Sequence, residues 1–465
     1  MSTTRELEKI ASILGIIILS VIFFTIEKGI SDFVIILSLF IFYIYFFRSI
    51  LKSTTIVRGI KTYLSINFFF LLFMYIVFYN PYQLYLLGLY DINAIELPFN
   101  LHLNMTNKSL ILTDIALVSF MLGFNTKYYD KSAIEGIKVN INLLNNLSFF
   151  FVVILIISIS IFLGTGGVNM FIGSYAGSNT GSITGNAIFN VINIFFTLLA
   201  VNIIYIFYLF KKVSFINRIL LFLILVWSIL LLVLGDRNTF FLLAIAIGGA
   251  FFTFIKSISR IKICLFVFLG LSLYNVIERT RNLESLTLDE VSRVLNKEKE
   301  KNAYGADAFN TTLVTLRSSI DLVPEKKDFY YGKLKFVSFT SIIPYSSRIF
   351  ISIDDKEYSS ADIISEYMIG RDAGWHTGTN IISDLYLDFG VFGVIIGMLI
   401  IGFYGGYVKN TILKNPFNIK YFFIYIIILC YYSEISRYGF DFPLRSIFWT
   451  LFIFKIIQFN QLKKS

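Results

Sequence analysis

The chain has 465 residues, of which 56% are apolar, 18% are aromatic and only 15% are charged. Soluble domains are typically about 45–50% apolar even when glycine is counted, so a water-soluble fold would expose much apolar surface. The formal net charge of +10 does not indicate a nucleic-acid-binding protein, because the basic residues lie between apolar segments and form no basic stripe. Composition therefore predicts an all-α, polytopic membrane helix bundle.

Apolar segments that suit membrane-spanning helices recur along the chain. Such a helix needs about 20 mostly apolar residues, with a usual range of about 17–25. The first nine segments are 10–26, 33–47, 62–79, 109–124, 147–164, 188–210, 217–235, 239–255 and 261–277. The last three are 386–407, 419–434 and 444–459. The sequence thus predicts about twelve transmembrane helices, nine within residues 1–277 and three within residues 386–465.

The basic residues of the connections predict which side each connection faces. Every second connection carries at least three Lys or Arg, namely 48–61, 126–138, 211–218, 256–262 and 409–420. Because basic connections mark the cytoplasmic side, both termini are expected inside the cell.

The longest connection, residues 278–385, is then expected outside. Its sequence predicts a mostly helical external loop, with amphipathic helices in LDEVSRVLNKEKEK and AFNTTLVTLRSSIDLV. The stretch GKLKFVSFTSIIPYSSRIF is typical of a segment that lies on the membrane surface and ends at Pro344.

Nothing in the sequence predicts a metal or another cofactor. Cys264 and Cys430 both lie in apolar segments, and no CxxC motif or histidine-rich tract occurs. Of the two histidines, His102 has no charged neighbour in the sequence nearer than Lys108, so we rank it low as a functional residue.

The stretch GDRNTFFLLAIAIGG places Arg237 at the outer start of a predicted helix. Arg237 and Gly248 are eleven residues apart, close to three helical turns, so both are expected on one helix face about 16 Å apart. The arginine can clamp an anion, while the glycine lets a helix or a lipid chain approach. Anchoring of a helix end among lipid headgroups is an equally good interpretation of Arg237.

Two more arginines, Arg279 and Arg281, follow the predicted ninth helix in VIERTRN. Arginine donates bidentate hydrogen bonds, which suits a diphosphate at a membrane surface. Contact with lipid headgroups is the alternative interpretation of both residues.

The short outer connection SEISRYGFDFPLRS is unusually charged for its position. It carries Glu434, Arg437, Asp441 and Arg445. Ionisable groups near membrane depth often mark functional sites, and a structural salt-bridge cluster is the alternative.

The tract SEYMIGRDAGWHTGTN, directly before the predicted tenth helix, contains the second histidine. His376 lies near Arg371, Asp372 and Glu366 in the sequence. Histidine titrates near neutral pH and serves as a general base. The alternative is an ordinary surface histidine, which is the commoner case for a lone loop histidine.

These features together resemble the Wzy family, the O-antigen and capsule repeat-unit polymerases. GDRNTFFLLAIAIGG, GKLKFVSFTSIIPYSSRIF and HTGTNIISDLYLDFGVFG are similar to segments of that family. The chain departs from the family in two places. Tyr345, where family members often have arginine, follows Pro344, and Asp384 stands where they often have glutamate.

The resemblance implies a GT-C-like fold in the bacterial inner membrane, with the active site facing outward. It implies transfer of a growing glycan from undecaprenyl diphosphate to the terminal sugar of a new lipid-linked repeat unit. No metal or nucleotide sugar is implied. The implied partners are undecaprenyl-diphosphate-linked oligosaccharides and membrane lipids, together with a chain-length regulator and a flippase.

The family's chemistry needs a general base, fixed cations for the diphosphate and a lateral opening for lipid. The candidate bases are His376, Asp372, Glu366 and Glu434. The candidate diphosphate-binding residues are Arg237, Arg279, Arg281, Arg371, Arg437 and Arg445. Gly248 and Gly249 are the candidates for the lateral opening.

Three other functions fit parts of the sequence. An O-antigen ligase would share the fold and the donor but use a lipid A core as acceptor. A flippase or other transporter often has twelve helices too, although transporters tend to have repeated halves and charges near the bilayer midplane. A structural subunit of an envelope complex is the third alternative.

Overall fold

The computed structural model describes residues 2–51, 54–55, 61–89, 92, 100–126, 141–165, 183–233, 236–280, 307–343, 359–370 and 377–462. Most of these residues are helical. Within the described ranges the only strands are β1 (Thr54–Thr55) and β2 (Lys61–Thr62), which pair antiparallel.

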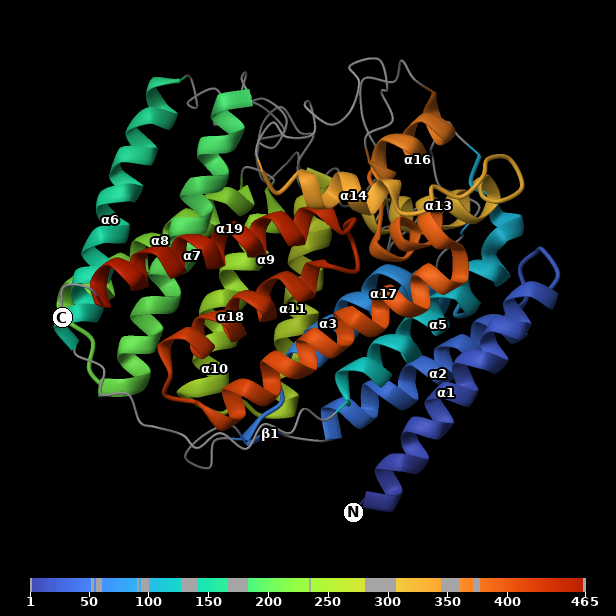
Figure 1. Cartoon of the computed structure of the whole chain (residues 1–465), viewed down its shortest axis with the longest axis horizontal. Coiled ribbons are helices and arrows are strands. Elements are labelled where there is room, and N and C mark those ends of the chain that lie inside the picture. The colour runs from blue at the N-terminus through green and yellow to red at the C-terminus, as the bar shows by residue number, and fades with distance from the viewer. Residues whose placement is uncertain are drawn as a thin grey trace.

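The helices follow one another in three groups along the chain (Figure 1). The first group is α1 (Ser2–Thr25), α2 (Asp32–Leu51), α3 (Ile66–Met74), η1 (Tyr75–Tyr79), α4 (Asn80–Leu86), η2 (Leu103–Met105) and α5 (Thr106–Phe124). The second group is α6 (Ile141–Gly164), α7 (Ile183–Phe210), α8 (Phe215–Val233), α9 (Arg237–Ala244), η4 (Ile245–Gly249), α10 (Ala250–Phe254) and α11 (Arg260–Thr280). The third group is α13 (Asp307–Leu322), α14 (Lys333–Thr340), α16 (Ser360–Ile369), α17 (Ile381–Lys414), α18 (Ile419–Glu434) and α19 (Asp441–Leu462).

The predicted all-helical, polytopic membrane fold is confirmed. Each of the twelve predicted apolar segments overlaps a helix or a run of consecutive helices. Among the described residues, eight helical stretches are long and apolar enough to cross a membrane, and Asn238–Phe254 is apolar but shorter. Segments 261–277, 419–434 and 444–459 lie in helices outside that set, so the number twelve stays a prediction.

Helix α5 packs against α1, α2 and α17 and is buried along nearly its whole length. Its backbone packs directly against α17, because α17 has glycines at the contact. A Cβ atom on Gly402 would lie 2.1 Å from the carbonyl oxygen of Phe120, and one on Gly406 would lie 2.4 Å from that of Phe124. Glycines four residues apart therefore permit this close helix pair, as they do in other membrane proteins.

Helix α17 is kinked near its N-terminal end, and α14 packs against the kink. Gly390 has φ +62°, which breaks the regular helix. The backbone N–H groups of Tyr330 and Tyr331 donate to the carbonyl oxygens of Leu387 and Asp388 there. The Asp388 carboxylate accepts hydrogen bonds from the backbone N–H groups of Gly332, Leu334 and Lys335, at the start of α14. A carboxylate at a helix N-terminus stabilises the helix.

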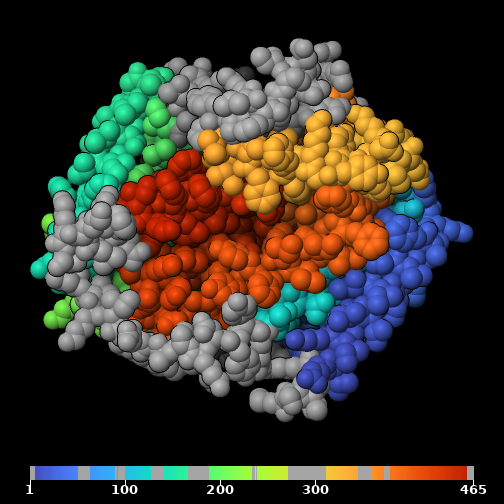
Figure 2. Space-filling view, viewed as in Figure 1, coloured from blue at the N-terminus to red at the C-terminus, as the bar shows by residue number. Residues whose placement is uncertain are grey.

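The described part of the predicted external loop gathers on one side of the bundle. Helices α13, α14 and α16 lie together at the top of Figure 1, while the β1 hairpin lies at the opposite end. Figure 2 shows residues 307–343 as a layer over α17 and α19. AFNTTLVTLRSSIDLV forms α13 as expected, whereas the amphipathic helix expected in LDEVSRVLNKEKEK lies outside the described residues.

Helix α17 begins earlier than the apolar pattern indicates. It starts at Ile381, five residues before the predicted segment, because the Asn380 side chain caps it by accepting the Ser383 N–H at 2.8 Å. Asp384, which the sequence places in the external loop, therefore belongs to the first turn of α17.

Candidate functional site

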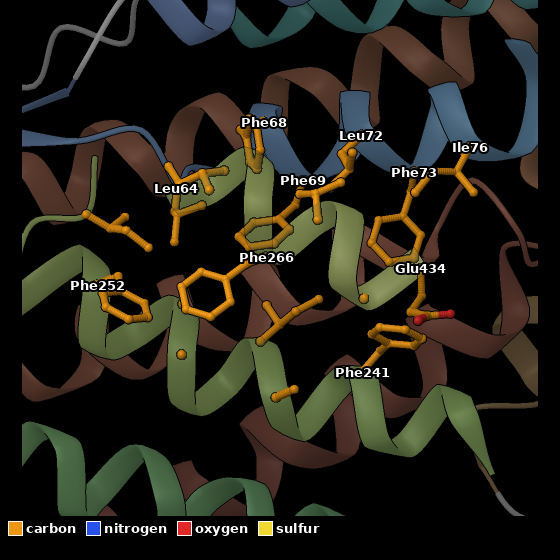
Figure 3. Close-up of a pocket in the computed structure, with 18 of the residues that line it drawn as sticks. Leu64, Phe68, Phe69, Leu72, Phe73, Ile76, Phe241, Phe252, Phe266 and Glu434 are labelled. Carbon is orange, nitrogen blue, oxygen red and sulfur yellow. The ribbon is translucent and has the colours of Figure 1, made fainter. Parts of the chain in front are cut away.

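An apolar cavity of about 320 Å³ lies between α3, η1, the α9–η4–α10 segment and α11. Phenylalanine, leucine and isoleucine side chains form most of its wall, and Glu434 lies at one end (Figure 3). The lining residues are Leu64, Phe68, Phe69, Leu72, Phe73, Ile76, Phe241, Ala244, Ile245, Gly248, Gly249, Phe252, Ile258, Ile263, Phe266, Val267, Gly270, Glu434 and Arg437. We call this cavity the groove, and its Glu434 end the mouth.

The α9–η4–α10 segment forms one wall of the groove. Asp236 caps α9, since its carboxylate accepts the Thr239 N–H at 3.1 Å. After two turns, the hydrogen bonding changes to a π-helical turn, η4, at Ile245–Gly249. Such turns are rare and often occur at functional sites.

The two glycines of η4 have different surroundings. A Cβ atom on Gly248 would meet nothing within 4 Å, so this residue leaves the groove open. A Cβ atom on Gly249 would lie 2.9 Å from Cδ2 of Leu429 on α18. Gly249 therefore permits close packing of α18, whereas Gly248 contributes to the width of the groove.

Glu434 places a carboxyl group at the end of an otherwise apolar wall. It is the last residue of α18 and is only 1% exposed. Figure 3 shows its carboxyl group beside Phe73 and Phe241. An ionisable group this buried at a membrane helix end is expensive, and such groups are by default candidates for function.

Arg437 joins the turn after α18 to the start of α9. Its Nη1 atom donates to Oδ1 of Asn238 at 2.8 Å, and its backbone N–H donates to the Glu434 carbonyl oxygen at 3.0 Å. Because Asn238 follows Arg237 directly, position 237 lies at the same mouth as Arg437. Two candidate sites that are far apart in the sequence thus come together.

Asp384 on α17 and Lys335 on α14 hold the turn after α18 in place. The Asp384 carboxylate accepts the Phe440 N–H at 2.9 Å and pairs with Lys335 Nζ at 2.7 Å. Lys335 Nζ also lies 3.4 Å from Asp388 Oδ2. All four residues are largely buried or half-buried, so the network fixes the position of the segment that carries Glu434 and Arg437.

Residues 377–380, directly before α17, and helix α16 pack against the turn that follows Glu434. The Thr377 N–H donates to Ser365 Oγ at 2.9 Å, which joins residues 377–380 to α16. A Cβ atom on Gly439 would lie 2.9 Å from Cγ2 of Thr379 and 3.4 Å from Oγ of Ser360. Residues 377–380 and the turn after Glu434 are therefore in contact.

The structure brings some of the candidate residues together. Glu434, Arg437, Gly248 and Gly249 line one groove, and the backbone of Arg237 begins the helix at its mouth. Glu366 on α16 is half-buried and Arg445 on α19 is exposed, and neither lines the groove.

The structure does not describe the side chains of the other candidate residues. His376, Asp372, Arg371 and Arg281 lie outside the described residues. The same holds for the side chains of Arg237 and Arg279, although their backbones are described.

His102 has charged neighbours that the sequence does not reveal. It is 6% exposed, its Nδ1 atom lies 3.2 Å from Oδ2 of Asp321 on α13, and its ring stacks on Tyr367 of α16. Tyr367 also donates to Asp321, and Lys326 contacts both. We call these four residues the His102 cluster; it ties α13 and α16 to the segment before α5.

The charges of the His102 cluster balance one another at neutral pH. Burial lowers the pKa of His102, because it outweighs the opposing effect of the Asp321 carboxylate. Burial raises the pKa of Asp321, but the hydrogen bonds from Lys326 and Tyr367 outweigh burial, so the pKa lies below its usual range. The cluster therefore holds a neutral imidazole, a carboxylate and an ammonium group near pH 7.

Sequence reasoning missed Asn238, Lys335 and Asp388 as members of the site region. Asp384 and Asp388 are four residues apart, a spacing that puts both on one face of a helix and was a usable signal. Lys335 reaches them from a helix about fifty residues earlier, and no local pattern reveals that contact. Among the described residues, no three His, Cys, Asp or Glu side chains are grouped closely enough to hold a metal ion.

Comparison with known proteins assigns the family. Residues 9–464 match the family model described as O-antigen polysaccharide polymerase Wzy, so the chain belongs to that family. No curated protein and no solved structure matches it. The resemblance inferred from the sequence is thereby confirmed. The family's activity is O-antigen polymerisation in membranes from lipid-linked oligosaccharide repeat units, and the chain is a multi-pass membrane enzyme of that kind.

Proposed function

We propose that this member of the family joins lipid-linked repeat units at the mouth of the groove. The growing glycan is transferred from undecaprenyl diphosphate to the terminal sugar hydroxyl of a new undecaprenyl-diphosphate-linked unit. One observation carries the proposal: a cavity with apolar walls ends at Glu434 and Arg437. Such a cavity suits a substrate with an apolar tail and an anionic, reactive head.

The transfer needs a base for the acceptor hydroxyl. The hydroxyl oxygen bonds to the anomeric carbon of the donor while the bond from that carbon to the diphosphate oxygen breaks. The hydroxyl proton passes to the base. Glu434 is our first choice, because its carboxyl group is buried and borders the groove. His376, Asp372 and Glu366 are the alternatives.

The departing diphosphate gains negative charge and needs fixed cations. Arginine in a site of low dielectric constant stabilises such charge strongly. Arg437 lines the mouth, and Arg237 precedes its hydrogen-bond partner Asn238. Arg279, Arg281, Arg371 and Arg445 are the supporting candidates. No metal or nucleotide sugar is required in this scheme, because the donor lipid carries the leaving group.

The lipid tails reach the site from the membrane. The open space at Gly248 supports it as part of a lateral entrance, while Gly249 serves the packing of α18. We place the protein in the bacterial inner membrane, with both termini in the cytoplasm and the mouth facing outward. A flippase supplies its substrate, and a chain-length regulator acts with it.

A purified assay separates this function from transport. Full-length protein in detergent is mixed with lipid-linked repeat units, and the products are separated by length. Polymer is expected, and it excludes a pure flippase because no membrane has to be crossed. Absence of polymer from folded protein would contradict the proposal. Arg237→Ala should fold in membranes and stop chain growth, and normal long glycan from that variant would remove Arg237 from the site.

A gene deletion separates a polymerase from a ligase. Loss of a polymerase leaves a single repeat unit on the lipid A core, whereas loss of a ligase leaves none. The proposal predicts the single unit.

A further inference from the structure

A second cavity of about 690 Å³ lies where α10 ends and α11 begins. Phe252, Ile258 and Phe266 line both this cavity and the groove. The two spaces are therefore neighbours that share one wall. The second cavity lies at the end of the groove away from Glu434, since Phe252 and Glu434 are at opposite ends of Figure 3.

The mouth of the groove and the second cavity are separated by about the thickness of the hydrocarbon core of a bilayer. From Arg237 to Phe254 the chain runs through α9, η4 and α10, and 17 helical steps at about 1.5 Å each span about 26 Å. The hydrocarbon core of a bilayer is about 30 Å thick. The second cavity thus lies near the opposite membrane boundary, in a connection whose three basic residues mark the cytoplasmic side.

The polar part of this cavity is positively charged. Lys256 and Lys262 line it together with Ser257 and Ser259, and none of the described residues that line it is acidic. Helix α11 begins at Arg260, between the two lysines, so the positive end of its dipole adds to their field. Basic pockets between membrane helices on the cytoplasmic side bind anionic lipid headgroups.

We propose that this cavity binds an anionic phospholipid of the inner leaflet. Its phosphate contacts Lys256 and Lys262, and the two serine hydroxyls donate to its oxygens. One acyl chain passes between Phe252 and Phe266 toward the groove. The site is distinct from the mouth and does not depend on the chemistry proposed there.

The source of the phosphate is tested by thermal unfolding of the purified, full-length protein in neutral detergent. The additives are phosphatidylglycerol, phosphatidylcholine with the same chains, short-chain phosphatidylglycerol and glycerol 3-phosphate. We expect phosphatidylglycerol to raise the unfolding temperature most. Equal stabilisation by glycerol 3-phosphate would mean that a free anion binds there, and equal stabilisation by phosphatidylcholine would mean no charge recognition. Either result overturns the proposal, as does no stabilisation at all.

A matched pair of double variants locates the site. Lys256→Gln with Lys262→Gln should weaken phosphatidylglycerol binding about tenfold or more, measured by native mass spectrometry, since each basic residue near the headgroup contributes to binding. Lys211→Gln with Lys212→Gln removes two exposed lysines of the α7–α8 connection, another basic connection, and should leave binding unchanged. Equal losses in both double variants would show that only general surface charge attracts the lipid.

Discussion

The mouth of the groove and the His102 cluster both bury charged groups, but in different surroundings. In the cluster, Asp321 contacts His102, Lys326 and Tyr367, and these contacts join segments that pack tightly. At the mouth, Glu434 is at least as buried, yet its carboxyl group borders an apolar space large enough for part of a lipid.

This difference separates stabilising charges from functional ones. A buried ion with good hydrogen-bond partners holds a fold together, and removal of one partner leaves the other uncompensated. Glu434 borders a cavity that a ligand can enter, so its carboxyl group is placed to act on that ligand. Substitutions at the mouth should therefore reduce activity, while substitutions in the His102 cluster should reduce stability.

Glu434→Gln should have the largest effect on activity. Loss of a general base typically lowers the rate about 10²–10⁴-fold, and glutamine keeps the shape of the side chain. The rate is measured by polymer formation with purified protein, and thermal unfolding is expected to be unchanged. Glu366→Gln tests an alternative base that does not line the groove, and it should leave activity unchanged. If Glu366→Gln abolishes activity and Glu434→Gln does not, the base lies on the α16 side.

Arg437→Lys should reduce polymer formation about 10²-fold, comparable to the loss of one donor that stabilises a transition state. Lysine keeps the charge but not the bidentate geometry, and it cannot hold Asn238 in the same way. Asn238→Ala, which leaves the arginine in place, should cost less. An Arg437→Lys enzyme as active as the wild type would exclude a geometric role for the guanidinium group.

Gly248 and Gly249 of η4 allow the same comparison between activity and stability at neighbouring positions. Gly248→Leu should fill the groove and lower activity about tenfold through a higher KM, with little change in unfolding temperature, because nothing lies near its Cβ. Gly249→Leu should instead destabilise the protein by about 1–3 kcal/mol, because Leu429 already occupies that space. Both are checked by kinetics and thermal unfolding, and equal behaviour of the two variants would contradict these assignments.

Substitution in the His102 cluster should change activity least. Asp321→Asn should lower the free energy of unfolding by about 1.5–3 kcal/mol, the usual contribution of hydrogen bonds to a charged group. Activity per folded molecule should change less than about twofold. A large loss of activity at unchanged stability would move this cluster into the functional site.

The His102 cluster also predicts a pH dependence of stability. The folded pKa of His102 is lowered, so the unfolded state binds more protons once the pH falls below about 7. Stability should therefore decrease as the pH falls through the range below the unfolded pKa of about 6.5. Unfolding of the wild type and of His102→Gln is compared from pH 8 to pH 5. The variant should lack this part of the decrease.

The sequence predicts the helices well because membrane helices need long apolar segments. The predicted segment 419–434 coincides with α18, and the predicted segment 109–124 coincides with α5 except that the helix begins at Thr106. The kink of α17 was not predicted, since Gly390 is one of several glycines in that helix and only its backbone conformation distinguishes it. The early start at Ile381 was missed because Ser383 and Asp384 interrupt the apolar pattern in the first turn.

The site was predictable where the chemistry is concentrated in one short stretch. Glu434 and Arg437 stand out because a short outer connection is rarely so charged. Their meeting with Asn238 was not predictable, since that contact joins residues 199 positions apart. The pairing of His102 with Asp321 was missed for the same reason, so a histidine with no charged neighbour in the sequence proved to have one in space.

Photolabelling of the groove tests the central claim most directly. A polyprenyl diphosphate analogue with a photoreactive diazirine on its first isoprene unit is cross-linked to the purified protein, and the labelled peptides are identified by mass spectrometry. The label is expected on Phe73, Phe241 or their neighbours at the mouth, and natural donor should compete it away. Competable labelling confined to the outer surfaces of α1, α6 or α8 would contradict a donor site in the groove.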